Sequence, residues 1–246
     1  PKVDILTAGF PCQSISAAGR MLGMKDERWV WDDIVAAIGA LRPGRVVFEN
    51  VRALLSIDEG RCMAAVVLGL AELGYLGRYG VVRASQAGAP HRRERVFIVA
   101  TDSSRTRRRE VPRSTYAHEG PHEGRPEVNG HQPGGSPEDA EGPEFWRQSW
   151  PAVERWGRLT GRPVPAAFYR NDVSARLTEW LMGLPEGWVT DVLPNARALA
   201  VVGAGVCPQQ GLLGLRMLDG LSMPSLEDCP TMEDIFDLLE LSALAV

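Results

Sequence analysis

Three short segments of the sequence carry side chains that could do chemistry, and each lies beside a run of apolar residues. Cys12, a potential nucleophile, follows the apolar run 3–8. Glu49 ends a second run, and Arg93 and Arg95 introduce a third. The strands of an α/β sheet place ligand-binding residues at their carboxyl ends, so we expect Cys12 and Glu49 to share one edge of a sheet. Arg93 and Arg95 alternate, and their side chains are expected to leave the same face of a strand.

A thiol, a carboxylate and fixed guanidinium groups are together the parts of a covalent catalyst. A thiolate that adds to an electrophilic carbon divides one difficult step into easier ones, and nearby arginines favour the thiolate form. A carboxyl group can exchange a proton with the group under attack, and a guanidinium can bind an oxygen on which negative charge develops. Each segment alone is also compatible with a structural role, as a buried cysteine, a surface carboxylate at a strand end, or a solvated charged turn.

The composition is that of an ordinary globular chain with one basic region. The chain has 246 residues, 44% hydrophobic and 24% charged, and a formal net charge of −4. Arginines are dense between residues 92 and 113, which fits contact with phosphate through one face. The four cysteines include no Cys-x-x-Cys pair, so neither a disulfide framework nor a metal site is expected. No long apolar stretch or signal peptide indicates a membrane segment.

Apolar periodicity predicts alternating strands and helices, and therefore an α/β domain with a mainly parallel sheet. Continuous apolar runs indicate strands at 3–8, 45–49, 79–84 and 95–101. Helical spacing of apolar residues indicates helices at 29–41, 63–73, 177–182, 209–218 and 232–244. The stretch from 103 to about 143 is rich in Gly, Pro, Arg, His and Glu, which predicts a loop-dominated insertion.

Five ordered blocks of this sequence together resemble the cytosine carbon-5 DNA methyltransferase family of restriction-modification systems. The blocks are Gly9-Phe10-Pro11-Cys12-Gln13-Ser14 with its extension to Arg28, Glu49-Asn50-Val51, and the segments 88–99, 176–188 and 203–210. The sequence departs from the family pattern at His91, where Gln is more usual, and at Ala204, where Asn is usual. Agreement of five blocks in order favours the catalytic interpretation of Cys12, Glu49 and the two arginines over the structural one.

The resemblance implies a Rossmann-like, S-adenosylmethionine-dependent methyltransferase fold and a role for each site residue. Cys12 would add to carbon 6 of a cytosine flipped out of double-stranded DNA, and the methyl group of S-adenosylmethionine would be transferred to carbon 5. Glu49 would act at ring nitrogen 3, Arg95 would hold the carbonyl oxygen of the base, and Arg93 would support the site. Residues expected to contact the DNA are Gln13, Ser16, Arg20, Arg28 and Asn50, although Arg20 is as readily a solvent-exposed side chain. Residues expected beside the cofactor are Pro11, Gly203, Gly205 and Val206.

The resemblance also predicts how the chain is divided. We expect a catalytic core at 1–102, a small irregular target recognition lobe at 103–172, a return segment at 173–218 that completes the core, and an acidic tail at 219–246. Trp146, Trp150 and Trp156 are expected to form the core of the lobe. Cys62 and Cys207 are expected to serve packing.

The family's glycine-rich cofactor block, Phe-x-Gly-x-Gly-Gly, does not occur in the sequence. We therefore expect the fold without its first strands, in a fragment of a longer protein, since the sequence starts without Met and inside a strand. Two alternatives stay open: one subunit of a split methyltransferase whose second chain supplies the cofactor-binding half, and a catalytically incomplete DNA-binding remnant. The expected location is the cytoplasm of a bacterial or phage-infected cell.

Overall fold

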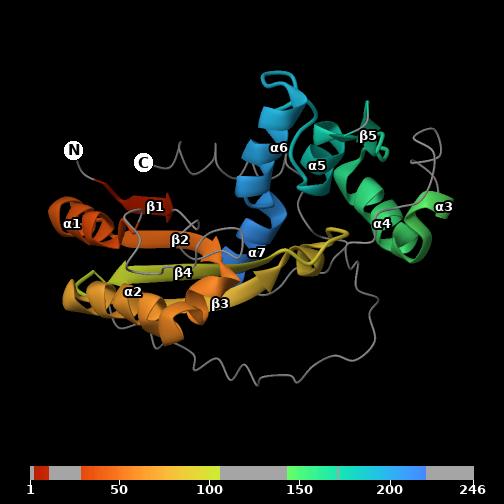
Figure 1. Cartoon of the computed structure of the whole chain (residues 1–246). Helices are drawn as coiled ribbons and strands as arrows, with labels where there is room; N and C mark the ends of the chain where they lie inside the picture. Colours follow the sequence, from red (N-terminus) through yellow and green to blue (C-terminus); the bar gives the residue numbers. More distant parts are fainter. Residues whose placement is uncertain (1–2, 11–28, 106–142, 171, 220–246) are drawn as a thin grey trace. The chain divides into compact units, whose positions relative to one another are not determined.

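Two compact units account for the residues that the computed structural model describes, which are 3–10, 29–105, 143–170 and 172–219 (Figure 1). The first unit contains 3–10, 29–82, 94–105 and 214–219, and the second contains 83–93, 143–170 and 172–213. These boundaries differ from the expected ones, because 83–93 and 173–213 belong to the second unit and not to the core. The physical reason is that Ala84, Ala89 and the helices after residue 173 share a hydrophobic cluster of their own.

The first unit is built on a four-stranded sheet with the strand order β1-β2-β4-β3. The strands are β1 (Ile5–Gly9), β2 (Arg45–Val51), β3 (Tyr75–Arg83) and β4 (Glu94–Asp102). β1 and β2 are parallel, whereas β2 and β4 are antiparallel. The predicted α/β class is confirmed, but the expectation of a mainly parallel sheet is wrong at β4. β4 lies between β2 and β3 in the sheet, and no α-helix connects β3 to β4. Parallel neighbouring strands require a long crossover connection, usually a helix, so this short connection does not allow β4 to run parallel to β3.

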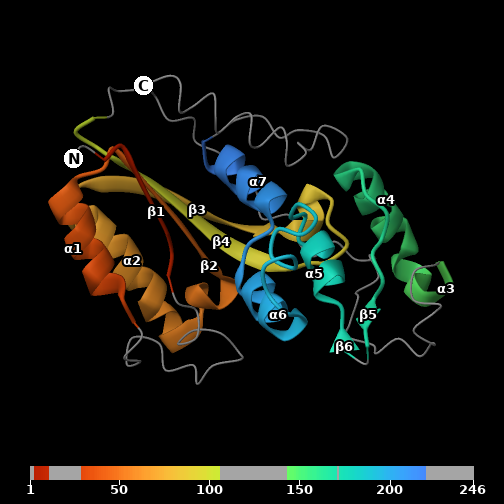
Figure 2. The same ribbon diagram turned by 90° about the horizontal axis from the view of Figure 1, so that it is seen from above.

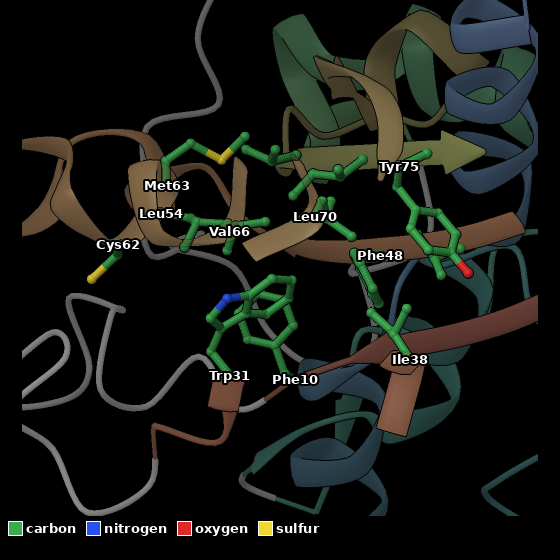
Figure 3. Packing of buried hydrophobic residues seen from close by; sticks show 14 of the residues in the cluster. Phe10, Trp31, Ile38, Phe48, Leu54, Cys62, Met63, Val66, Leu70 and Tyr75 are labelled. Carbon is green, nitrogen blue, oxygen red and sulfur yellow. The ribbon is translucent and has the colours of Figure 1, made fainter. Parts of the chain in front are cut away.

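One face of this sheet is covered by α1 (Trp31–Leu41) and α2 (Arg61–Glu72) (Figure 2). Phe48 of β2 is fully buried there, and its ring packs edge-on against that of Trp31, with 5.6 Å between the ring centroids (Figure 3). The Trp31 indole N–H donates to the Ala65 carbonyl at 3.1 Å, which ties α1 to α2. A Cβ atom at Gly69 would lie 3.0 Å from the Trp31 ring, so the absence of a side chain lets the two helices approach. Cys62 is fully buried in this core, as predicted.

The opposite face of the sheet receives the second half of α7 (Pro208–Asp219). A Cβ atom at Gly214 would come within 2.6 Å of the Phe97 ring on β4, so the helix backbone lies directly on that side chain. The end of α7 is fixed by an ion pair between Asp219 and Arg45 at the start of β2. The sheet of the first unit is therefore packed on both faces.

The second unit is mainly helical. Its elements are α3 (Pro143–Trp146), α4 (Trp150–Thr160), the short antiparallel pair β5 (Phe168–Tyr169) and β6 (Asp172–Val173), α5 (Ala175–Leu181), α6 (Asn195–Ala204) and the first half of α7. Trp156 and Trp180 are each 1% exposed, and the Trp156 indole donates to the Trp180 carbonyl at 2.8 Å. Trp146 and Trp150 pack against this core and Cys207 is buried in it, so the packing roles expected for these residues are confirmed.

The segment Asn195–Asp219 has the length and apolar composition that a membrane-crossing helix would need. The chain is extended at Gly205, however, and this divides the segment into α6 and α7. Neither helix reaches the ~20 residues that span a bilayer. The helix predicted at 232–244 lies outside the described residues.

Candidate functional site

The ends of β1 and β2 lie side by side, as the sequence predicted for the residues that follow them. In the parallel register Gly9 is the partner of Glu49. A Cβ atom at Gly9 would lie 3.6 Å from Glu49 Oε2, so the chain leaves β1 beside this carboxylate. Cys12 follows Gly9 by three residues in the sequence. Predicted site residues that lie outside the described part of the chain are Pro11, Cys12, Gln13, Ser16, Arg20 and Arg28.

Glu49 and Arg95 form an ion pair across β2 and β4. Arg95 is the register partner of Val51, and Glu49 that of Phe97, so the two charged residues are diagonal neighbours on one face. Arg95 Nε lies 2.8 Å from Glu49 Oε1. Their side chains are 13% and 24% exposed, which leaves the pair reachable from solvent but in surroundings where charges interact more strongly than in water. The structure thus brings together two of the four residues predicted to be catalytic.

Hydrophobic burial decides the face on which the carboxylate lies. Val46 and Phe48 of β2 are fully buried against α1 and α2. Successive side chains of a strand point to opposite faces, so Glu49 must point away from that core. The apolar pattern of β2 therefore orients Glu49 toward the face on which Arg95 stands.

Asn50, which was predicted to contact DNA, is a buried residue in the structure. Its side chain belongs to the core face of β2 and is 2% exposed. The amide Nδ2 donates to the Phe10 carbonyl at 3.3 Å, and Oδ1 accepts from the Val51 N–H at 2.8 Å. Among the described residues, the polar atoms of this side chain are thus bonded to backbone groups inside the protein. Asn50 instead links β2 to the residue that precedes Pro11 and Cys12 in the sequence.

Arg93 is placed differently from the expectation that it shares a face with Arg95. β4 begins only at Glu94, and Arg93 has a left-handed backbone with φ 32°, so strand alternation does not extend to it. Its Nη2 donates to the carbonyl oxygens of Gly203 and Gly205, both at 2.6 Å. Arg93 thus binds the carboxyl end of α6 in the second unit, whereas Arg95 binds Glu49 in the first.

Gly203 lies at the end of α6, and Gly205 and Val206 lie in the turn that follows this helix. All three were predicted to lie beside the cofactor, and that remains a prediction. A Cβ atom at Gly203 would meet nothing within 4 Å, so no close approach among the described residues requires glycine there. The carbonyls of Gly203 and Gly205 are engaged by Arg93, and Val206 is half-buried.

Glu179 is a buried polar residue that sequence reasoning missed. It lies in α5, is 1% exposed, and its carboxylate accepts hydrogen bonds from the backbone N–H groups of Gly187, Val189 and Thr190 at 3.0, 2.6 and 3.1 Å. The Thr190 hydroxyl adds a fourth bond at 3.0 Å. The signal was present as a lone carboxylate inside an apolar helix, followed by a Gly- and Pro-containing turn whose backbone donors need acceptors.

The groups with displaced pKa values lie at other positions. Hydrogen bonds from the Ser104 side chain and backbone lower the pKa of Asp102, and Arg42 lowers it further. Burial raises the pKa of Tyr75, and burial lowers that of Arg162. Asp102 ends β4, at the opposite end of the strand from Arg95. Among the described residues, no group of three or more His, Cys, Asp or Glu side chains could hold a metal ion.

Comparison with known protein families identifies the family that has this arrangement at the ends of β1 and β2. The family model for C-5 cytosine-specific DNA methylase matches residues 1–133, more than half of the chain. The chain belongs to this family. Membership confirms the resemblance seen in the sequence, and with it the S-adenosylmethionine-dependent methyltransferase fold class.

Several type II methyltransferases are similar to this C-5 cytosine methylase chain. M.DsaV of Dactylococcopsis salina is 36% identical over 100 residues, which is 40% of this chain and 28% of the relative. M.NgoBI of Neisseria gonorrhoeae is 39% identical over 100 residues, with 40% of this chain and 32% of the relative covered. The chain thus matches about a third or less of the length of these curated relatives.

Solved structures of other methyltransferases are similar to the chain at lower identity. The methyltransferase EhMeth of Entamoeba histolytica is 13% identical, with a TM-score of 0.48 over 83% of this chain and 73% of that protein. The S. pombe Dnmt2 methyltransferase is 15% identical, with a TM-score of 0.46 over 83% of this chain and 74% of that protein.

Proposed function

We propose that this chain carries the cytosine-attacking residues of a DNA cytosine carbon-5 methyltransferase that acts on double-stranded DNA. The observation that supports the proposal most directly is the Glu49–Arg95 pair, with its 2.8 Å separation, beside the end of the strand that leads to Cys12. Nitrogen 3 and the carbonyl oxygen of cytosine are neighbours on one edge of the ring. A carboxyl group and a guanidinium can bind these two atoms at once only if they also lie side by side, as Glu49 of β2 and Arg95 of β4 do.

The proposed reaction begins at the cytosine ring. The Cys12 thiolate forms a bond to carbon 6, and the electron pair of the carbon 5–carbon 6 double bond moves toward carbon 5. Glu49, in its protonated form, gives a proton to ring nitrogen 3, so no negative charge accumulates on the ring. Arg95 holds the carbonyl oxygen by hydrogen bonds from its planar guanidinium. After carbon 5 gains a methyl group, its own proton passes to a base, the proton on ring nitrogen 3 returns to Glu49, and the electron pair of the broken carbon 5–hydrogen bond re-forms the ring double bond as the thiolate leaves.

The methyl group comes from S-adenosylmethionine, the donor that the family implies. When bound, this cofactor supplies an electrophilic methyl group to carbon 5. The described residues account only for what happens on the cytosine side, where Glu49 and Arg95 bind and orient the ring.

Cytosine carbon 5 cannot be reached inside a duplex, so the base must be flipped out of the helix. Gln13, Ser16, Arg20 and Arg28 follow Cys12 in the sequence and are proposed to contact the flipped base or the nearby phosphates. Residues 103–172, with their dense arginines, are proposed to read the target sequence.

The proposal is tested with a duplex that carries 5-fluorocytosine in place of cytosine, incubated with the chain and S-adenosylmethionine. Fluorine at carbon 5 prevents the final proton loss, so the protein stays covalently attached to the DNA. We expect an adduct that survives denaturation and is abolished by Cys12→Ser. Peptide mapping of the adduct should locate the bond at Cys12 and not at the buried Cys62 or Cys207.

An adduct that persists in Cys12→Ser would contradict the proposed nucleophile. Absence of an adduct from a folded wild-type chain would show that this chain is not active alone. The assay repeated with a polypeptide that supplies the cofactor-binding half then decides between a split or truncated enzyme, which recovers the adduct, and a DNA-binding remnant, which does not.

A further inference from the structure

The segment 83–93 is tied to the carboxyl ends of two helices of the second unit. His91 Nε2 lies 2.9 Å from the Leu181 carbonyl oxygen at the end of α5. Arg93 binds two carbonyls at the end of α6. The last carbonyls of a helix have no partner within the helix and carry partial negative charge. Two side chains of segment 83–93 therefore bind carbonyl groups that have no hydrogen-bond partner within their own helices.

Arg93 is also held through its backbone. Its carbonyl oxygen accepts a hydrogen bond from Gln210 Nε2 at 2.6 Å, and Gln210 is a fully buried residue in the first turn of α7. The side chain of Arg93 thus binds the end of α6 while its backbone binds the start of α7. The turn that joins the two helices, 205–207, lies between these attachments in the sequence.

The backbone conformation of Arg93 indicates that these contacts determine its position. Its φ of 32° lies in the left-handed region, which side chains other than glycine rarely adopt. Such a conformation persists only where surrounding contacts over-determine it. The bonds to Gly203, Gly205 and Gln210 are contacts of this kind.

We propose that Arg93 is a positioning residue, which holds the turn between α6 and α7, and that it does not touch the cytosine or the DNA phosphates. This inference rests on the proposed function, and it assigns different roles to Arg93 and Arg95. Arg95 binds the base together with Glu49, whereas Arg93 acts on the reaction through the end of α6 and the 205–207 turn. Removal of the Arg93 side chain should therefore slow the reaction without lowering the affinity for DNA.

The test compares Arg93→Ala, Arg93→Lys and Arg42→Ala in two DNA assays on the full chain. Arg42 is the matched control, because it also binds a carbonyl at a helix end, with Nη1 2.7 Å from the oxygen of Leu73 after α2, and it pairs with Asp102. We expect Arg93→Ala to slow adduct formation at saturating DNA by about 10- to 100-fold. Arg93→Lys should recover part of the rate, because it keeps the charge but lacks the planar fork. Arg42→Ala should leave the rate unchanged at a temperature where it is folded.

The salt dependence of DNA binding separates a positioning role from a phosphate contact. An arginine that neutralises one phosphate contributes about 0.9 to the slope of log K against log salt. We expect the slope of Arg93→Ala to equal that of the wild type. A slope reduced by about one would overturn the proposal, and so would an adduct rate equal to that of Arg42→Ala, which would leave Arg93 a purely structural residue.

Amide hydrogen exchange tests the same contacts without any reaction. In Arg93→Ala the amides of residues 202–211 should exchange faster than in the wild type, whereas Arg42→Ala should leave them unchanged. If the wild-type chain forms no adduct, the proposed function fails for this chain, and exchange alone decides on Arg93. Equal exchange in the two variants would then reject its role at the turn.

Discussion

The Asn50 side chain joins the core face of β2 to the carbonyl oxygen of Phe10, with Nδ2 3.3 Å from that oxygen. Phe10 is itself 6% exposed and packs against Trp31 and Phe48. The chain that continues to Pro11 and Cys12 therefore starts from a fixed and buried point. The Asn50 amide thus adds a side-chain link between the first two predicted catalytic segments to the parallel pairing of Gly9 with Glu49.

Asn50→Asp should lower the free energy of unfolding by about 1–3 kcal/mol, since it places a carboxylate oxygen against a buried carbonyl and removes the donor. Urea unfolding measures the loss. Asn195→Asp is the matched control, because Asn195 also donates to a carbonyl, that of Val173 at 2.9 Å, but at an exposed position near a helix start. Water can replace the lost bond there, so the control should lose less. Equal losses would contradict the structural role of Asn50.

Glu49→Gln should slow covalent adduct formation by about 10²- to 10⁴-fold, the range that loss of an acid–base group produces. The variant keeps the size of the side chain but removes both the proton transfer and the charge that pairs with Arg95. Single-turnover gels of adduct against time give the rate. Glu59→Gln is the control, because Glu59 forms an ion pair of similar length with Arg61, 2.6 Å, but is 80% exposed on the surface. A comparable loss of rate in Glu59→Gln would argue against a specific role for Glu49.

Gly214→Ala should destabilise the first unit by about 1–3 kcal/mol, because the added methyl group would lie 2.6 Å from the Phe97 ring and force α7 away from the sheet. Gly203→Ala provides a matched change in α6. Its methyl group would meet nothing within 4 Å, so helix propensity should make this variant neutral or more stable by up to about 1 kcal/mol. Urea midpoints at one temperature compare the two, and a Gly214→Ala protein as stable as the wild type would show that α7 does not lie on Phe97.

Asp102 should make the stability of the chain depend on pH in the acid range. Its folded-state pKa is lowered, first by the hydrogen bonds from Ser104 and then by Arg42, so the charged form is favoured by folding. The resulting stabilisation is fully present above the usual value of 3.8 and is lost as the pH falls from there through the lower folded-state pKa.

Thermal unfolding at a series of pH values measures this effect. Asp102→Asn should lower the Tm at neutral pH and should flatten the fall of the Tm below the usual pKa. A variant whose Tm falls with acid as steeply as that of the wild type would assign the acid sensitivity to other carboxyl groups.

Local sequence patterns were enough to predict most of the elements and the family. The runs that became β1, β2 and β4 are continuous apolar segments, and α1, α2, α5 and α7 have apolar residues at helical spacing. These signals are local, because side chains alternate along a strand and recur every turn of a helix. The juxtaposition of Glu49 with the end of β1 was also predictable, since two parallel strands bring their carboxyl ends to one edge.

Only the tertiary structure decided which side chains meet. The antiparallel direction of β4 sets the register that brings Arg95 to Glu49. These strands are far apart in the sequence, and neither segment alone indicates that they pair. Asn50 and Arg93 belong to recognisable motifs, yet burial on the core face turned the first inward, and a left-handed backbone turned the second toward α6. The sequence by itself thus determined the chemical groups and the elements that carry them. Long-range pairing and packing determined their partners, because those depend on contacts that no local pattern encodes.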